Sequence, residues 1–148
     1  MAYSSIPENE QRISQFSGYS HLENALNIGS KIGSGTYLGT TRFDEHVMTD
    51  IEQNLQGRKE YIGIQHIGDY LALVLSSDRQ VAESIAEELH KITGQAFGLA
   101  PYKHGQRPGL VHANAAKALE RAERAGKGHH LFNIKTDTVE ARLSRFLH

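Results

Sequence analysis

The sequence predicts an α+β domain, or a mixed α/β domain, in which helices pack on a sheet of about four or five strands. Segments with helical periodicity alternate with short segments rich in β-branched and aromatic residues. They give the order α-β-α-β-β-α-β-α-β-α, with a β-hairpin near the middle. The 148 residues show no internal repeat and no linker, so we expect one domain over 20–148, preceded by a polar N-terminal arm over 1–19.

The hairpin is the clearest local signal. Two β-rich segments, 61–67 and 70–75, flank Gly68-Asp69, and glycine supplies the positive φ that a two-residue hairpin turn needs. The second segment, YLALVL, is apolar at almost every position, as expected of a strand covered on both faces. We therefore place it in the interior of the sheet. Three further short strands are expected, one in the segment GTYLGTT, one from Ala96 to Ala100 and one in the segment HLFNIK.

Capping residues and glycines set the predicted helix ends. Three capping boxes mark helix starts: Ser20 with Glu23, Ser77 with Gln80, and Asp137 with Glu140. Pro108 fits the first turn of another helix, where its missing N–H costs nothing. The first helix is expected to end at Gly29, the helix over DEHVMTDIEQNLQG at Gly57, and the helix after Ser77 at Gly94.

Apolar residues at helical spacing predict which faces are buried. The helix after Pro108 has a face of mostly small side chains and must therefore approach its neighbour closely. The five predicted faces are Leu22, Ala25 and Leu26; Val47, Ile51 and Leu55; Val81, Ile85, Leu89 and Ile92; Val111, Ala115, Ala118, Leu119 and Ala122; and Val139, Leu143, Phe146 and Leu147.

The composition excludes several classes of protein. The chain is 39% hydrophobic and 22% charged, and its mean hydropathy of -0.47 argues against a membrane protein. No apolar run approaches the roughly 18 residues of a spanning helix, and the start MAYSSIPENEQR does not resemble a secretory signal. The absence of cysteine excludes disulfides, thiol nucleophiles and cysteine zinc sites. We expect a cytoplasmic protein without membrane association.

Charge is distributed unevenly along the chain. Residues 1–96 hold 7 Lys and Arg against 13 Asp and Glu, whereas residues 97–148 hold 9 against 4. The net charge is therefore -6 in the first part and +5 in the second. Basic surfaces attract phosphates, nucleic acids or acidic proteins, so the C-terminal third is the expected binding region.

Within this basic region, the loop YKHGQRPG and the following helix provide the candidate site. The loop offers a tyrosine, two cations and glycines, and three cations at i, i+4 and i+7 form a stripe along the helix. The alternative is a solvated face on which Glu120 pairs with Arg124 and Glu123 with Lys127. The candidate ligand-binding residues are Tyr102, Lys103, His104, Arg107, His112, Lys117, Arg121 and Arg124.

The glycine-rich stretch GSKIGSGTYLGTT, residues 29–41, raises the question of a phosphate-binding loop. In a P-loop, lysine follows the last glycine, and the loop leads from a strand into a helix. Here Lys31 precedes Gly33, and the stretch leads from a helix into a strand. The dinucleotide fingerprint fails as well, because the spacing of the glycines does not match. We therefore predict a flexible connector whose glycines serve turn geometry.

The same region also carries a family resemblance. The turn SGYS, the helical pair Asn24-Ala25 and the stretch GSGTYL resemble the opening of ADP-ribosyltransferase-like domains over about 25 residues. The resemblance implies an NAD-handling site. The chain departs from the pattern at its first turn, where Tyr19 and Ser20 replace the usual His or Arg pairing, and no catalytic glutamate is identified.

Nine histidines do not form a recognisable metal site. The HExxH spacing is absent, and His129 and His130 would point to opposite faces of a strand. His104 and His112 could converge across the loop, but exposed or hydrogen-bonded imidazoles are the simpler interpretation. We predict no metal site and no cofactor.

Three functions stay open from the sequence. The first is a binding or regulatory protein that engages a phosphate-bearing ligand or nucleic acid through the basic C-terminal third. The second is an accessory or inhibitor protein that binds an acidic protein partner. The third is a nucleotide- or NAD-handling enzyme, placed last because spacing alone assigns no catalytic constellation. The sequence does not predict the catalytic residues or the oligomeric state.

Overall fold

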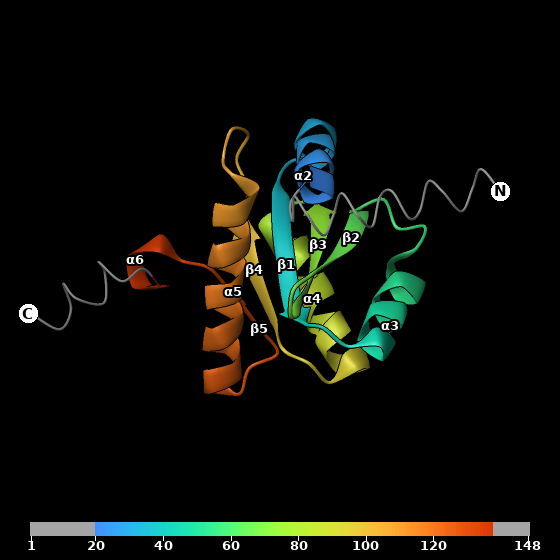
Figure 1. Ribbon diagram of the computed structural model, residues 1–148, viewed down its shortest axis with the longest axis vertical. Helices are drawn as coiled ribbons and strands as arrows, with labels where there is room; N and C mark the ends of the chain where they lie inside the picture. The colour runs from blue at the N-terminus through green and yellow to red at the C-terminus, as the bar shows by residue number, and fades with distance from the viewer. Residues whose placement is uncertain (1–19, 138–148) are drawn as a thin grey trace, which may run out of the picture.

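A computed structural model of the chain describes residues 20–137, in which helices pack on a five-stranded mixed sheet (Figure 1). The predicted α+β class is confirmed, and the elements follow the predicted order. The expected arm over 1–19 and the expected apolar face beyond residue 137 lie outside the described residues. The elements are α2 (Ser20–Ile32), β1 (Thr36–Arg42), α3 (Glu45–Leu55), β2 (Tyr61–Ile67), β3 (Tyr70–Ser76), α4 (Arg79–Thr93), β4 (Phe97–Pro101), α5 (Pro108–Ala125), β5 (His129–Leu131) and α6 (Ile134–Asp137).

The strand directions decide which loops meet. The sheet order is β2-β3-β1-β4-β5, and β1 pairs antiparallel with both β3 and β4. Because β5 pairs parallel with β4, the strands β3, β4 and β5 all run in the same direction. The segments that follow these three strands therefore leave the sheet at one edge.

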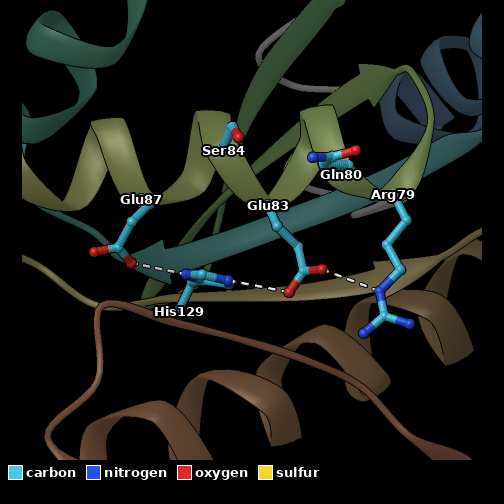
Figure 2. Close-up of a pocket in the computed structure, with 6 residues that line it drawn as sticks. All are labelled: Arg79, Gln80, Glu83, Ser84, Glu87 and His129. Carbon is cyan, nitrogen blue, oxygen red and sulfur yellow. Dashed lines mark hydrogen bonds and ion pairs between the residues drawn. The ribbon is translucent and has the colours of Figure 1, made fainter.

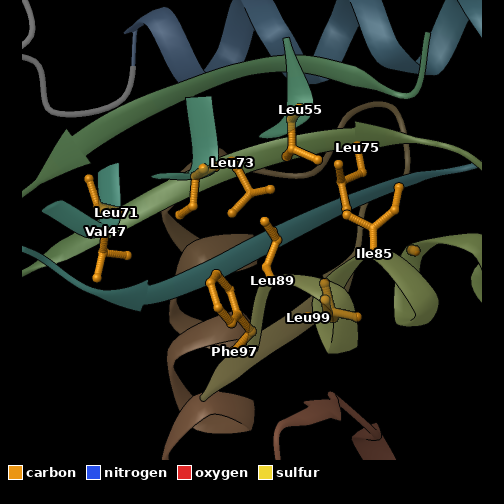
Figure 3. Packing of buried hydrophobic residues seen from close by; sticks show 12 residues of the cluster. Val47, Leu55, Leu71, Leu73, Leu75, Ile85, Leu89, Phe97 and Leu99 are labelled. Atoms are coloured by element: carbon orange, nitrogen blue, oxygen red, sulfur yellow. The ribbon is translucent and has the colours of Figure 1, made fainter. Parts of the chain in front are cut away.

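Two helices cover each face of the sheet (Figure 1). On β3, Leu71, Leu73 and Leu75 face α3 and α4, while Ala72 and Val74 face α2 and α5. Figure 3 shows the first of these clusters, in which leucines of β3 pack with side chains of α3 and α4. The predicted interior position of β3 is confirmed. Its hairpin turn uses Gly68 at a φ of 57°.

The close approach predicted for α5 is also confirmed. The predicted face of small residues is fully buried. Opposite it, β4 carries Gly98, and a Cβ atom at this position would collide with the carbonyl oxygen of Ala115 and the amide nitrogen of Leu119. The glycine therefore lets the helix backbone lie directly against the strand.

The glycine-rich stretch differs from the prediction. The first helix does not end at Gly29 but continues to Ile32, and β1 begins at Thr36. The glycines serve close packing: Ser76 Oγ donates to the Gly29 carbonyl at 3.1 Å, and a Cβ on Gly35 would lie 2.7 Å from the Ser77 carbonyl oxygen. Most of the stretch is regular structure packed against the end of β3, rather than a flexible connector.

Two details of α4 and the C-terminal part of the domain also differ. The residue that caps α4 is Asp78, whose Oδ1 accepts from the Val81 N–H at 2.9 Å, whereas the prediction placed the cap at Ser77. Ile92 remains 40% exposed, because the buried face of α4 is formed by Ala82, Ile85, Ala86 and Leu89. The last strand covers His129–Leu131, one residue earlier and shorter than expected.

No helix within residues 20–137 is long and apolar enough to cross a membrane.

Candidate functional site

The loop between β4 and α5 presents three cationic or titratable side chains. Lys103 to Gln106 form a tight turn: the Gln106 N–H donates to the Lys103 carbonyl at 3.0 Å, and the Gln106 side-chain oxygen accepts from the Lys103 N–H at 2.7 Å. Gly105 supplies the positive φ, at 95°, that this turn requires. The side chains of Lys103, His104 and Arg107 are exposed. Within residues 20–137 these three side chains form no ion pair or hydrogen bond.

Two of the predicted ligand-binding residues lie in the core instead. Tyr102 is 7% exposed, and its hydroxyl donates to Asn27 Oδ1 at 2.9 Å. His112 is 5% exposed and lies edge-on to the Tyr70 ring, with Nε2 3.4 Å from Thr40 Oγ1. Burial lowers the pKa of His112, which favours the neutral imidazole. Their burial keeps both residues away from a ligand on the loop surface.

The helical stripe is separate from the loop and largely paired. Arg121 Nε lies 3.2 Å from Asp137 Oδ1, and Arg124 lies 3.4 Å from Glu120. Arg107 and Arg124 are about 25 Å apart along α5 at the rise of an α-helix. Lys117 is exposed on the same helix. The eight predicted residues are thus divided among the loop, the core and the distal part of α5.

The anticipated Glu123–Lys127 pair is replaced by a longer-range one. The Arg42 guanidinium of β1 donates to both carboxylate oxygens of Glu123, at 2.9 and 3.1 Å. The same guanidinium lies 5.2 Å from the centre of the Tyr70 ring. The Glu120–Arg124 pair of the solvated-face alternative is present as anticipated.

A cavity of about 430 Å³ lies beside the loop, at the sheet edge where β3, β4 and β5 end. Arg79 comes from the segment after β3, Lys103 and Gln106 from the segment after β4, and the remaining wall from the segment after β5 and from α5. Ligands of open α/β sheets commonly bind at the carboxyl ends of strands. The lining residues are Arg79, Pro101, Lys103, Gln106, Asn114, Leu131, Phe132, Asn133 and Ile134.

Sequence reasoning found Lys103 but missed the other polar residues of this cavity. Arg79 lies 24 positions before Lys103 and is the first residue of α4. In the sequence, the only signal at this point is a helix cap, which does not indicate a binding site. In the sequence, nothing distinguishes Asn114 and Asn133 from other surface asparagines. The strand directions bring them together, and no local pattern encodes those directions.

Arg79 is held by a chain of polar side-chain contacts (Figure 2). Its Nε donates to Glu83 Oε2 at 3.0 Å, and Glu83 Oε1 lies 3.1 Å from Nε2 of His129. The other ring nitrogen of His129 lies 2.8 Å from Glu87 Oε1. These four side chains also line a second cavity, of about 570 Å³, together with Gln80 and Ser84.

The two carboxylates of this chain of contacts are ionised at neutral pH. Burial raises the pKa of Glu83, but hydrogen bonds from Arg79 and His129 outweigh it, so the pKa lies below its ordinary value. The hydrogen bond to His129 likewise lowers the pKa of Glu87. The described part of the chain contains no group of three or more His, Asp or Glu side chains arranged to hold a metal ion.

No protein-family model and no curated protein sequence matches the chain, whereas solved structures match its fold. The GGDEF domain of DgcB from Caulobacter crescentus, in complex with c-di-GMP, has a TM-score of 0.58 at 14% identity, over 76% of this chain and 84% of that chain. The chain has a GGDEF-like fold. A GGDEF domain from Pseudomonas aeruginosa matches with a TM-score of 0.58 at 12% identity, over 83% of this chain and 96% of that chain.

Diguanylate cyclase SiaD from Pseudomonas aeruginosa, in complex with its activator SiaC, shares the GGDEF-like fold less closely. Its TM-score is 0.50 at 14% identity, over 86% of this chain and 73% of that chain. Read in one-letter code, the string GGDEF does not occur in this sequence. The one Gly-Asp pair, Gly68-Asp69, lies at the β2–β3 turn in the sequence IGDYL. At these identities the similarity concerns the fold.

Proposed function

We propose that this protein is a binding or regulatory domain that engages a phosphate-bearing ligand through its basic C-terminal third. The observation that carries the proposal is the set of exposed cationic side chains, Lys103 and Arg107 with His104 between them, that no carboxylate of the described residues neutralises. Cations without a protein partner attract phosphate oxygens, which Lys and Arg bind by charge-assisted hydrogen bonds.

The structural relatives support this class of ligand. DgcB, which shares the fold, is in complex with the phosphate-bearing nucleotide c-di-GMP. SiaD, which also shares it, is in complex with a protein activator, so regulation by binding occurs on this architecture. We carry over the class of ligand, a phosphate-bearing molecule, and take the contact residues from this chain.

A small ligand fits the structure better than a nucleic acid. Duplex DNA presents one charge per about 1.7 Å and is bound by an extended track of cations. On α5 that track is interrupted, because Arg121 and Arg124 are paired with Asp137 and Glu120. Lys103 and Arg107, on the loop before the helix, form no ion pair within residues 20–137.

The test is a binding titration with c-di-GMP, GTP and a single-stranded oligonucleotide. We expect the wild-type protein to bind a phosphate-bearing nucleotide with an affinity that falls as salt rises. The double variant Lys103→Gln/Arg107→Gln should weaken binding by tenfold or more, since each lost charged hydrogen bond accounts for about 1.5–3 kcal/mol.

The matched control is Lys59→Gln/Lys91→Gln, which removes two exposed lysines elsewhere on the surface. The proposal is overturned if none of the three probes binds, or if the control double variant weakens binding as much as the loop variant. Conversion of GTP into a product would overturn the binding role in favour of the enzyme alternative. Binding of the oligonucleotide alone would identify a nucleic-acid protein instead.

A further inference from the structure

We propose that the cavity at the carboxyl ends of β3, β4 and β5 binds a nucleoside monophosphate, with Arg79 and Lys103 on the phosphate and Phe132 against the base. This inference rests on the proposed function and deepens it by naming the ligand class and its contacts. It adds Arg79, Asn114, Phe132 and Asn133 to the residues that the sequence indicated.

Arg79 is oriented for a phosphate by contacts on one side of its guanidinium. Nε is occupied by Glu83, which is itself held by His129. The two terminal nitrogens form no hydrogen bond within residues 20–137, and Figure 2 shows them directed away from Glu83. A guanidinium fixed at Nε still offers its terminal donors to two phosphate oxygens, the bidentate geometry that arginine favours.

The rest of the cavity suits a nucleobase. Phe132 is partly buried at the margin of the α2/α5 cluster and lines the cavity as well, so its ring can contact a planar base. Asn114 and Asn133 line the same cavity. Asn133 Oδ1 accepts from the Lys135 N–H at 2.9 Å, while its amide nitrogen forms no hydrogen bond within residues 20–137. Amides of this kind pair with the donor and acceptor edges of a base.

The size of the cavity limits the ligand. Its volume of about 430 Å³ lies in the lower part of the range of small-molecule pockets, roughly 300–1,000 Å³. Two cations on one cavity match one phosphate group, and Arg121 and Arg124 of α5 are already paired with carboxylates. The cavity therefore accommodates one phosphate and one base.

The experiment is isothermal titration calorimetry with GMP, guanosine and inorganic phosphate, at about 50 mM salt so that charge contacts are only weakly screened. We expect GMP to bind at least tenfold more tightly than guanosine or phosphate alone, because each of these lacks one half of the contacts. Arg79→Gln and Lys103→Gln should each weaken GMP binding by tenfold or more. Phe132→Leu, which keeps the packing but removes the ring, should weaken it about fivefold or more.

The controls are Arg58→Gln and Lys91→Gln. Arg58 also loses a carboxylate partner on substitution, Glu88 at 2.8 Å, but lies outside the cavity. Both controls should bind GMP within twofold of the wild type, and thermal unfolding verifies that each variant is folded.

The outcomes separate this inference from the function on which it rests. GMP binding that is unaffected by Arg79→Gln and Phe132→Leu overturns the cavity assignment, while the proposed function stands on the loop cations. Equal affinity for GMP and phosphate overturns the base contact. The proposed function itself is tested separately by its own probes and loop variants, and it fails if no phosphate-bearing probe binds at all.

Discussion

The two ends of α5 carry similar cations in different electrostatic settings. At the amino end, Lys103, His104 and Arg107 are exposed and form no ion pair within residues 20–137. At the carboxyl end, Arg121 and Arg124 lie within ion-pair distance of Asp137 and Glu120. Lys103 and Arg107 at the amino end thus have no carboxylate partner within the described residues, whereas both of these arginines at the carboxyl end are paired.

The two ends of α5 differ because of where the carboxylates that pair with their cations come from. Glu120 lies one helical turn from Arg124, so that pair could be read from the sequence. Asp137 reaches Arg121 from α6, and Arg42 reaches Glu123 from β1, which are contacts between separate elements. Net charge along a chain therefore locates a basic region but does not locate its free cations.

The largest effect on this comparison is expected from Asp137→Asn. The Asp137 side chain is fully buried, and it accepts from the Asn133 N–H at 2.7 Å, with His130 Nε2 at 3.0 Å and Arg121 at 3.2 Å. Losing a charged acceptor should lower the free energy of unfolding by about 1.5–3 kcal/mol, measured by urea denaturation. A change below about half a kcal/mol would show that this carboxylate does not hold the carboxyl end of α5.

The same variant should make the two ends of α5 more alike. Arg121 would lose its partner, so single-stranded DNA should bind with a salt slope more negative by about 0.7, the increment for one additional phosphate contact. An unchanged slope in a folded variant would mean that pairing is not what keeps this end from binding polyanions.

Much of the fold was predictable because its signals are local. Gly94 ends α4 in the left-handed conformation at a φ of 76°, and Pro108 opens α5, both as expected from the residue types. Gly29 misled because glycine often ends a helix, whereas here it lies inside α2, where Ser76 and Thr36 pack closely. The residues that require a glycine here belong to other elements, so the sequence around Gly29 does not reveal them.

The candidate site was less predictable for the same physical reason. The loop cations follow from composition, and Lys103 proved to line a cavity. Tyr102 was expected to stack on a ligand, but its hydroxyl bonds Asn27 of α2, a contact across 75 residues. Arg79 joins the cavity only because β3 and β4 run in the same direction.

We expect an intermediate effect of pH on the free energy of unfolding, exerted through His112, which is buried on α5 between its two ends. Its pKa is lowered by burial in the folded protein, so the unfolded chain binds the proton first as pH falls below about 6.5. The free energy of unfolding should therefore fall below this pH by up to about 1.4 kcal/mol per unit until His112 is protonated in the folded state. Well above a pH of about 6.5, where the unfolded chain has also released this proton, the residue contributes no pH dependence.

The measurement is urea denaturation of the wild type and His112→Gln between about pH 7.5 and 5.5, which spans the ordinary histidine pKa. The difference between the two proteins isolates His112 from the other histidines. Parallel pH profiles of the two proteins would contradict a neutral, buried His112 in the folded protein.

The smallest effect is expected from Glu120→Gln, which tests the comparison without disturbing the core. Glu120 and Arg124 are 3.4 Å apart, with side chains 60% and 61% exposed. Exposed pairs at i,i+4 contribute only about 0.3–0.5 kcal/mol, so the free energy of unfolding should barely change. Arg124 nevertheless loses its neutralising neighbour, and the salt slope for single-stranded DNA should become more negative by about 0.7 or less.

Glu88→Gln, which releases Arg58 on another part of the surface, is the matched control. GMP binding should stay unchanged in both variants, because neither residue lines the cavity. A tenfold change in GMP affinity on Glu120→Gln would instead connect the two ends of α5 into one binding surface, as the sequence alone suggested.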